Sequence, residues 1–484
     1  MSRSSTLPQR AIISSLCISL VIGLLSCAPP QHECVANPAL CMPSMQLEST
    51  YLTKTGGGEL KFSIQNLSAR VPVNVQLTQR DISKAPSALV TLKSPDGDHQ
   101  DYTGAFVARF TADQLASFSI GDANLIVTAG PDRAMGAATV YIALRDLTFS
   151  PTGIYQVDMT PDQYSPYPKQ LAIGADMSIL AIQGGKATGL GSPIQQLKTY
   201  SFIPGNAQLK DALSPPTVTR YQNLNRALPG DAVFAISSTM LVLSYVDIAS
   251  SNQVIQSCPL TSTSPTCLPE PADSLMLRAR ALGSDTAGSL LVAVKEDGAL
   301  VAFDMTPAGI NPKIPRKVDL DLKGLTATRV LLGVADVDGD SHPDVLAIHQ
   351  SASDIRASIL RSQPDGSFAD QETLSSALTS VIGGQNGLLA DLPISAIAVG
   401  DLDHDAGSLP DLAVARSGVI SFYLNQGKGT FRESPTQLVP QYSTAGQSID
   451  AIALADLNGD SLGDVIIAGT ANKLVGVYLN TSPH

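Results

Sequence analysis

The stretch Asp336-Val-Asp-Gly-Asp-Ser-His-Pro-Asp344 decides the fold, and it lies between apolar runs at 330–335 and 345–348. Its acids, at positions 1, 3, 5 and 9 of a nine-residue loop, are Asp336, Asp338, Asp340 and Asp344. Carboxylates this close repel one another unless a cation lies between them, and an all-oxygen set in a loose loop suits Ca²⁺ better than Mg²⁺. The residue at position 7, His342, would add its backbone carbonyl. The alternative is a polar hairpin turn without an ion.

This loop is not an EF-hand, because glycine stands at position 4 instead of 6 and Ala347 replaces the glutamate of position 12. The pattern recurs at 456–464, where the residues at positions 1, 3, 5, 7 and 9 are Asp456, Asn458, Asp460, Leu462 and Asp464. A further copy, with Asp401, Asp403 and Asp405, reaches its last acid only at Asp411. That acid comes two residues late, so we expect this site to be altered or empty. Each loop lies between strand-like runs, and glycine turns leading to Phe368 and Phe431 follow two of them.

Residues 330–368, 395–431 and 450–480 resemble the FG-GAP/VCBS repeat family, the calcium-loop propellers of integrin α-chain heads and many bacterial surface proteins. The resemblance implies a β-propeller whose loop cations are structural and whose faces bind partners. It names no partner. Upstream, only the spacing of the repeat remains.

Six anchor acids recur at intervals of 51 to 65 residues: Asp176, Asp231, Asp285, Asp336, Asp401 and Asp456. This spacing favours six blades, whereas the resemblance to the FG-GAP/VCBS family implies seven. The first three repeats have lost their other acids, so we expect no ion there. The last repeat has room for three strands, and we expect the missing strand to come from residues 150–160, around Ile154-Tyr-Gln-Val157.

Residues 1–27 are typical of a bacterial lipoprotein signal peptide. Arg3 and Arg10 form a basic region ahead of an apolar run at 11–25, which is too short for a membrane span. The stretch Leu24-Leu-Ser-Cys27 resembles a lipobox. Cys27 would carry the lipid, and Ala28 after it indicates the outer membrane by the enterobacterial rule. Residues 28–46 would be a tether. The alternative is ordinary signal cleavage with Cys27 incidental.

The remaining cysteines agree with export to an oxidising compartment. Cys34 and Cys41 form one local pair, and Cys258 and Cys267 form another, with turn-forming residues between the members of each pair. Local disulfides are the simplest interpretation. The sequence has no CxxC motif, so zinc or thiol-redox chemistry is poorly supported.

Residues 47–147 are expected to form a separate immunoglobulin-like β-sandwich, ahead of a propeller at 148–484. Alternating apolar residues over 60–64 and 71–77 and several further short strands fit that fold. The run from Phe106 to Thr128 resembles bacterial Ig-like or IPT/TIG domains, with a helical turn capped at Thr111. The whole chain is therefore predicted to be all-β, a sandwich followed by a six- or seven-bladed propeller.

Composition limits the function. A net charge of −12 with 15% charged residues argues against a nucleic-acid binder. Motifs of hydrolases, zinc proteases, dinucleotide-binding folds and P-loops are missing from the sequence, so we expect no enzyme. The leading hypothesis is a lipid-anchored, calcium-binding module of the bacterial cell envelope that holds a surface protein or glycan. The alternatives are an exported propeller enzyme, a hydrolase or lyase acting on polysaccharide, and a structural envelope-assembly lipoprotein.

Overall fold

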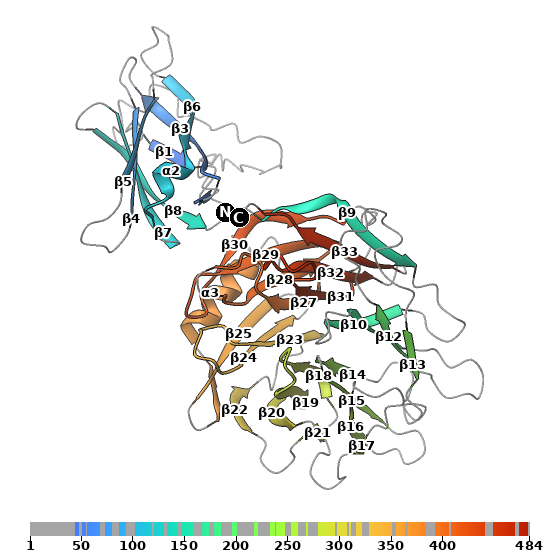
Figure 1. Cartoon of the computed structure of the whole chain (residues 1–484). Helices are drawn as coiled ribbons and strands as arrows, with labels where there is room; N and C mark the ends of the chain where they lie inside the picture. The colour runs from blue at the N-terminus through green and yellow to red at the C-terminus, as the bar shows by residue number, and fades with distance from the viewer. Residues whose placement is uncertain are drawn as a thin grey trace, which may run out of the picture.

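The structure is a computed structural model of the whole chain (Figure 1). It describes residues 44–47, 51–54, 56–67, 73–79, 87–92, 102–118, 121–129, 133–143, 147–158, 167–173, 179–184, 196–200, 217–220, 233–237, 239–246, 253–259, 268–269, 279–295, 298–306, 309–310, 316–321, 329–350, 355–363, 366–370, 372–383, 393–405, 408–440, 449–469 and 474–482. Outside these residues lie the signal peptide at 1–27, Cys27, Cys34, Cys41, Cys267, Asp176 and Asp231.

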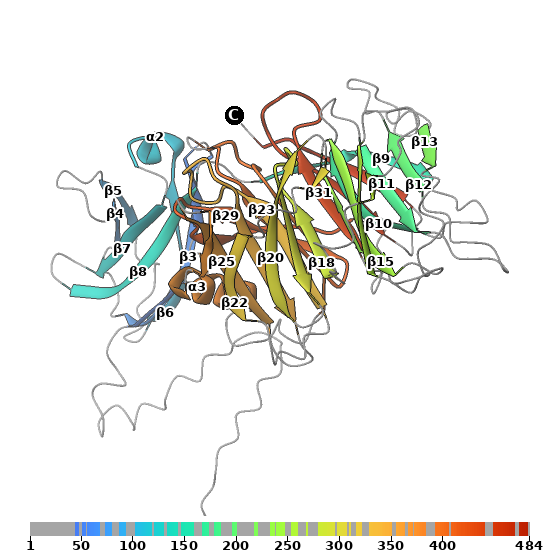
Figure 2. The same cartoon turned by 90° about the horizontal axis from the view of Figure 1, so that it is seen from below.

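The described chain is almost all β, and its first eight strands form two sheets around one apolar core (Figure 1). One sheet has the order β1 (Ser44–Leu47), β3 (Gly58–Leu67) and β6 (Tyr102–Phe110); the other has the order β2 (Tyr51–Thr53), β8 (Arg133–Ala143), β7 (Gly121–Ala129), β4 (Val73–Gln79) and β5 (Ser87–Leu92). Alternate residues of β3 and β4 point into this core, and the Phe62 ring stacks on Phe106 with centroids 5.6 Å apart. These sheets form a unit beside the larger body of the molecule (Figure 2).

Two local features of this unit bear on the sequence predictions. The helical turn α2 (Ala112–Leu115) begins after Thr111, whose hydroxyl accepts a hydrogen bond from the Gln114 backbone in a capping box, so the predicted cap is confirmed. The first strand begins at Ser44, inside the range assigned to the tether, because Ser44 to Leu47 pair in register with β3.

The rest of the chain forms antiparallel sheets whose strands mostly follow chain order. In chain order, the first three sheets are β10 (Tyr167–Ile173), β11 (Ile179–Gly184), β12 (Gln196–Tyr200) and β13 (Thr217–Arg220); β14 (Val233–Ile236), β15 (Met240–Val246), β16 (Gln253–Pro259) and β17 (Leu268–Pro269); and β18 (Ala279–Ser284), β19 (Leu290–Lys295), β20 (Ala299–Thr306) and β22 (Arg316–Asp321), with β21 (Gly309–Ile310) paired to β20. The next three are β23 (Arg329–Ala335), β24 (Asp344–Gln350), β25 (Ile355–Ser362) and β26 (Phe368–Asp370); β27 (Ile394–Gly400), β28 (Asp411–Arg416), β29 (Val419–Asn425) and β30 (Phe431–Leu438); and β31 (Ala451–Ala455), β32 (Asp464–Gly469), β33 (Leu474–Asn480) and β9 (Phe149–Asp158). One parallel pair, Val318 with Phe368, joins β22 to β26, so the third and fourth of these sheets are continuous and form one nine-stranded sheet.

The first strands of these sheets lie around a common axis, which gives a propeller-like arrangement (Figure 1). Strand β14 contacts β18, β18 contacts β23, β23 contacts β27, and β27 contacts β31; β10 contacts both β31 and β14. Neighbouring sheets share apolar cores, as where Leu346 and Ile348 pack with Leu412 and Val414. The neighbouring sheets thus bury their faces against one another.

The strand predicted at 150–160 is confirmed as the fourth strand of the last sheet. It is β9, which pairs antiparallel with β33, with Ile154 opposite Tyr478 and Val157 opposite Val475. The Thr481 amide also donates to the Thr148 carbonyl at 2.7 Å.

The helix α3 (Glu372–Gly383) follows β26 and was not expected from the sequence. It covers the part of β25 that the three-residue strand β26 leaves without a partner strand. The Ser375 and Thr379 hydroxyls, one turn apart, accept hydrogen bonds from the Ile359 and Ala357 amides, each at 2.9 Å. The helix thus satisfies backbone groups that would otherwise be buried and unpaired. Neither described helix has the length and apolarity needed to span a membrane.

Candidate metal centres in three acidic loops

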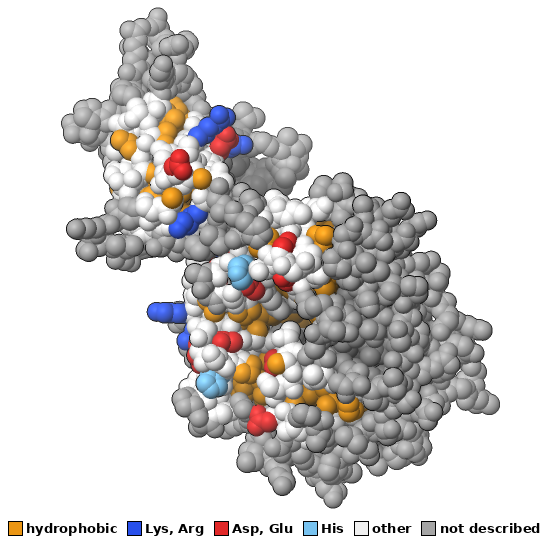
Figure 3. Space-filling view, in the orientation of Figure 1, with side chains coloured by type: hydrophobic (Ala, Val, Ile, Leu, Met, Phe, Trp, Pro, Cys, Tyr) orange, Lys and Arg blue, Asp and Glu red, His pale blue; other side chains and the backbone are white. Residues whose placement is uncertain are grey.

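Three acidic loops follow the first strands of neighbouring sheets. We call residues 336–344 the first loop, 401–411 the middle loop and 456–464 the third loop; they connect β23 to β24, β27 to β28 and β31 to β32. All three therefore lie at the same end of these sheets. Figure 3 shows acidic side chains beside histidines on one face of this body.

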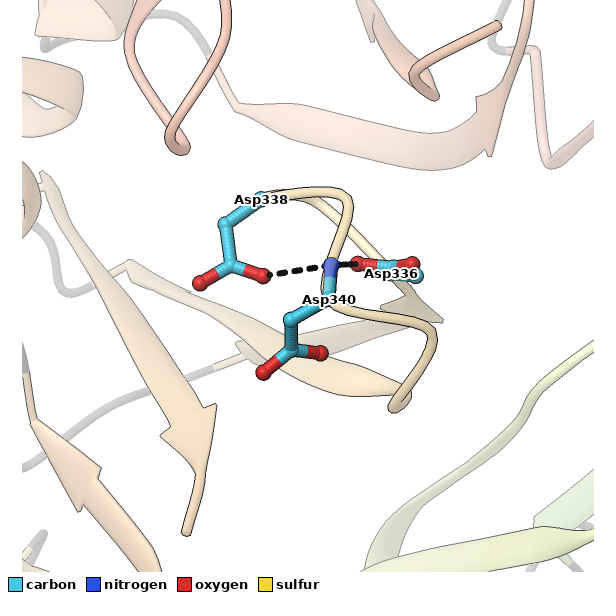
Figure 4. A group of neighbouring side chains, drawn as sticks. All are labelled: Asp336, Asp338 and Asp340. Carbon is cyan, nitrogen blue, oxygen red and sulfur yellow. Dashed lines mark hydrogen bonds between the residues drawn. The ribbon is translucent and has the colours of Figure 1, made fainter. Parts of the chain in front are cut away.

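In the first loop, Asp336 organises the turn (Figure 4). One of its carboxylate oxygens accepts hydrogen bonds from the Gly339 and Asp340 amides, at 2.7 and 3.1 Å, and the other accepts from Ser341 at 2.7 Å. The left-handed backbone at Gly339 (φ 81°) and Ser341 (φ 68°) makes this tight wrapping possible.

The same turn brings three carboxylates together. Oxygens of Asp336, Asp338 and Asp340 lie within 4.8 Å of one another. The fourth predicted ligand, Asp344, is not part of that group. It is fully buried below the turn, where it accepts from the Val337 amide at 3.1 Å and the Ser362 amide at 2.9 Å. The side chain of His342 is exposed, and its amide donates to Asp340 at 2.8 Å.

The third loop has the same construction. Asp456 accepts from the Gly459, Asp460 and Ser461 amides at 2.7, 3.1 and 2.7 Å, and φ is 80° at Gly459 and 68° at Ser461. The amide nitrogen of Asn458 donates to Asp460 at 3.0 Å, and the Leu462 amide donates to Asp460 at 2.9 Å. Buried Asp464 accepts from the Leu457 and Asn480 amides, at 2.9 and 2.8 Å. This correspondence means that the two stretches fold alike.

The middle loop departs from the other two at a different acid from the one that its spacing singles out. Although Asp411 comes two residues late, it accepts from the Leu402 and Asn425 amides, both at 2.8 Å, in the way that Asp464 accepts from Leu457 and Asn480. Oxygens of Asp401, Asp403 and Asp411 lie within 4.8 Å of one another. Asp405 is not in this group; it accepts from the Leu409 amide at 3.3 Å. Asp411 therefore occupies the position in the middle loop that Asp464 occupies in the third loop. The acid that departs from the pattern is Asp405.

The last acids of the loops lie in an unfavourable place for negative charge. Burial raises the pKa of Asp344 to about 7, and the carboxylates of Asp338 and Asp340 add to this, although backbone hydrogen bonds act against it. For Asp464, burial with the nearby Asp460 and Asp456 also raises the pKa to about 7. Burial and the Asp403 carboxylate raise the pKa of Asp411 well above its usual value.

One basic side chain enters the first loop. The Arg361 Nε atom lies 3.0 Å from Asp338 Oδ2, and a guanidinium N–H of the same arginine donates to the Lys428 carbonyl in the next sheet. Leu424 and Leu479 occupy the matching positions in the other two sheets, since each, like Arg361, directly precedes the residue whose amide donates to the buried acid.

The turn after β18 shows how an earlier repeat differs. Asp285 stands where Asp336 stands after β23, but β19 begins only five residues later, at Leu290. The Asp285 carboxylate accepts hydrogen bonds from the Ser289 and Leu290 amides and from the Ser289 hydroxyl, all at 2.8 Å. Its oxygens are thus used by the turn itself.

A cavity of about 740 Å³ runs between the first strands. Its described lining is mostly aliphatic, from residues such as Leu282, Leu331, Ala398 and Leu454. Arg280, Arg329 and Asp450 lie where these strands begin, opposite to the acidic loops, and Arg329 donates to the Ser395 carbonyl at 2.6 Å. Sequence reasoning did not single out these residues, since isolated charges at strand ends carry no motif.

Two asparagines were also missed. The side-chain amide of Asn425 donates to the Val337 carbonyl at 2.8 Å, and that of Asn480 donates to the Leu402 carbonyl at 2.8 Å. Each asparagine thus reaches from its own sheet to the acidic loop of the preceding one. The repeated tripeptide Tyr-Leu-Asn, at 423–425 and 478–480, is the sequence signal that could have identified them.

The donor sets of these loops fit a hard divalent cation. They consist of carboxylate, amide and backbone oxygens. A cation bound among them would offset both the burial of these carboxylates and the repulsion between them, which together raise the pKa of the buried acids.

Comparison with known proteins gives one family match. A model of the FG-GAP-like repeat matches residues 408–467, which include the end of the middle loop and the whole third loop. The chain matches no curated protein. Among solved structures, a DUF4784 family protein from Bacteroides caccae is 10% identical with a TM-score of 0.32, over 86% of this chain and 98% of that chain. Apo AztD from Citrobacter koseri is 10% identical with a TM-score of 0.27, over 77% of this chain and 96% of that chain.

Proposed function

We propose that this protein is an exported, lipid-anchored β-propeller that binds structural Ca²⁺ ions in its acidic loops and holds a protein or glycan at the bacterial cell envelope. The observation that carries the proposal is the set of three acidic loops at one end of neighbouring sheets, two of which cluster three carboxylates each. The FG-GAP-like match over 408–467 supports a propeller-type extracellular module.

Within this proposal the propeller has six blades. The support is the cycle of contacts among β10, β14, β18, β23, β27 and β31, together with the contribution of β9 to the last sheet. The unit before it is an immunoglobulin-like sandwich, supported by two sheets that enclose one core. We assign residues 47–147 mainly to the sandwich and residues 148–484 to the propeller.

The cation is Ca²⁺ rather than Mg²⁺. Carboxylate and backbone oxygens from one irregular loop provide many ligands without rigid octahedral geometry, which favours the larger ion. Extracellular modules of this kind bind Ca²⁺ with Kd values of about 10⁻⁴ to 10⁻³ M. The ions would stabilise the loops and the contacts between neighbouring sheets, since they would neutralise carboxylates that repel one another.

The anchor and the location rest on the sequence of residues 1–28, with Cys27 as the lipidated residue and the outer membrane as the destination. Cys34 with Cys41, and Cys258 with Cys267, would form disulfides after export. Of these residues the structure describes Cys258, which is fully buried in β16.

The protein would act by binding rather than by catalysis. Among the described residues that line the central cavity, Asp450 is the one acid, so that lining offers no pair of carboxylates for glycoside hydrolysis. Aliphatic walls close to the axis suit packing better than acid–base chemistry.

A calorimetric Ca²⁺ titration of the purified protein tests the proposal first. Saturable binding of two or three ions and a higher melting temperature are expected, with one ion lost in Asp336→Asn and one in Asp456→Asn. The control is Asp113→Asn in α2 of the N-terminal unit, which should leave binding unchanged. No binding at millimolar Ca²⁺ would overturn the cation assignment.

A second test addresses the anchor and the partner. The native protein should fractionate with membranes, and Cys27→Ser should release it from them. Envelope proteins or glycans captured by the immobilised protein should be lost on chelation of Ca²⁺ and recovered when Ca²⁺ is restored. Turnover of polysaccharide substrates without any captured partner would favour the exported enzyme instead.

A further inference from the structure

The two asparagines that end the third strands of neighbouring sheets connect the acidic loops to one another. Asn425 ends β29 and lies beside the middle loop; Asn480 ends β33 and lies beside the third loop. Both are almost fully buried, with exposed fractions of 4% and 0%. A buried amide that joins two loops can transmit the order of one loop to the other.

Asn480 contacts the third loop through its backbone and its side chain. Its backbone N–H donates to Asp464 at 2.8 Å, and its side-chain amide donates to the Gly463 carbonyl at 3.2 Å. The same amide donates to the Leu402 carbonyl in the middle loop at 2.8 Å. Leu402 lies between the clustered acids Asp401 and Asp403, so the asparagine fixes the backbone that carries them.

Asn425 repeats this arrangement one sheet earlier. Its backbone N–H donates to Asp411, and its side-chain amide donates to the Pro410 carbonyl at 3.2 Å in the middle loop and to the Val337 carbonyl at 2.8 Å in the first loop. Val337 lies between Asp336 and Asp338. The three loops are thus connected in the order third, middle, first.

Each asparagine uses its whole amide group. The Asn425 side-chain oxygen accepts from the Gly427 amide at 3.0 Å, and that of Asn480 accepts from the Ser482 amide at 3.1 Å. Two donors and one acceptor are therefore engaged at each position, which a shorter or singly functional side chain cannot reproduce.

The matching position on β25 supports a specific role for the amide. There the chain has Ser362, whose backbone N–H donates to Asp344 as those of Asn425 and Asn480 do to their acids. The preceding sheet carries the short turn at Asp285 instead of an acidic loop. Asparagine thus occurs where the preceding sheet has an acidic loop, and serine occurs where it does not.

We propose that Asn425 and Asn480 are positioning residues that couple the acidic loops, so that a Ca²⁺ ion in one loop raises the Ca²⁺ affinity of the next. The proposal rests on the proposed calcium binding. A bound ion orders one loop, the asparagine is held by that order, and the carbonyl between the acids of the neighbouring loop is fixed before its own ion arrives. The second ion then meets a smaller ordering cost.

The test is Asn480→Ser, which gives β33 the residue that β25 has at position 362. By calorimetric Ca²⁺ titration we expect about a tenfold weaker affinity at the middle loop, although none of its acids is changed. Asp456→Asn, which disables the third loop, should weaken the middle loop by a similar factor. The double variant should show no further weakening. The control is Ser362→Ala, which should leave all affinities unchanged.

A second measurement, hydrogen exchange, does not depend on the Ca²⁺ affinity of the middle loop. In Asp403→Asn, where the middle loop is disabled, Ca²⁺ binding to the third loop should still slow hydrogen exchange around Leu402, and Asn480→Ser should abolish that protection. The coupling would be overturned if Asn480→Ser left the Ca²⁺ affinity of the middle loop unchanged. It would also be overturned if Ca²⁺ did not change the rate of hydrogen exchange around Leu402. Either result would leave calcium binding itself intact. Absence of Ca²⁺ binding in the unsubstituted protein would overturn the proposed function itself. If Asn480→Ser fails to fold, Asn425→Ser tests the same coupling between the middle and first loops.

Discussion

Arg361 and Asp338 form an ion pair inside the first acidic loop, with Nε and Oδ2 3.0 Å apart and side-chain exposures of 24% and 12%. The arginine places a positive charge beside one of three clustered carboxylates. The other two loops have Leu424 and Leu479 at the matching position. The first loop therefore contains a basic side chain where the matching positions of the other two loops have leucine.

Replacing this arginine should strengthen the first cation site. In Arg361→Leu, the repulsion between the guanidinium and a bound ion is removed, and we expect the first-loop Kd for Ca²⁺ to fall roughly threefold to tenfold. Calorimetry of Arg361→Leu in an Asp403→Asn, Asp456→Asn background, in which the middle and third loops are both disabled, would report on the first loop. A weaker first site would show instead that Arg361 holds Asp338 in position.

Without Ca²⁺, the protein should lose stability as the pH rises towards neutrality. The pKa of Asp344 and of Asp464 is about 7 in the folded state, against an ordinary value of 3.8. Below pH 3.8 both acids are protonated in the folded and in the unfolded protein, and their contribution to the free energy of unfolding is fully present. That contribution is lost as the pH rises through the folded pKa, because the unfolded protein ionises more readily than the folded one. Thermal melts between pH 5 and 8 in chelator should therefore show a falling melting temperature.

Saturating Ca²⁺ should remove or reverse that trend, because the ion favours the ionised carboxylates. The same melts in millimolar Ca²⁺ provide the comparison. A calcium-free melting temperature that rises from pH 5 to 8 would contradict the expected ionisation of these acids.

The hydroxyl of Thr379 should stabilise the sheet it covers. It accepts from the Ala357 amide at 2.9 Å and donates to the Ala357 carbonyl at 3.1 Å. Thr379→Val keeps the shape but leaves both groups unpaired, so we expect a loss of about 1–3 kcal/mol in the free energy of unfolding, measured by urea denaturation. Ser376→Ala, at an exposed position of the same helix, should change it by less than about 0.5 kcal/mol. Equal losses in the two variants would rule out the proposed role of the hydroxyl.

Gly463 is expected to tolerate no side chain. A Cβ atom there would lie 2.1 Å from the Asp401 carbonyl oxygen, across the seam between the third and middle loops. Gly463→Ala should lower the free energy of unfolding by roughly 1–3 kcal/mol and weaken Ca²⁺ binding at both loops. Gly476→Ala in β33, whose Cβ would meet side-chain atoms at 3.2 Å, is the milder control. An unchanged free energy of unfolding in Gly463→Ala would mean that the third and middle loops can move apart at this contact without losing stability.

Much of the architecture could be predicted because it depends on local patterns. The acidic loops, the strands around them and the Thr111 cap follow from residue type and short spacing. The pairing of β9 with β33 could also be predicted, because the last repeat is one strand short.

Other features depend on contacts between distant residues, which spacing does not reveal. The spacing from Asp401 to Asp411 is two residues longer than in the other loops, yet the carboxylate binds the same two backbone amides as Asp464 does in the third loop. The helix α3 depends on how much of β25 the strand β26 leaves uncovered. The roles of Asn425 and Asn480 depend on which loop lies across the seam.

The pairing of β9 with β33 also has a consequence for synthesis. The Thr148 amide and the Ser482 hydroxyl that help to close the last sheet are 334 residues apart in the chain. A ribosome makes β9 long before β33, so one edge of β9 stays unpaired until β33 has been synthesised. Products that stop early would keep that edge exposed and be prone to aggregate or to be degraded. Completion of this sheet therefore distinguishes chains that include β33 from those that stop before it.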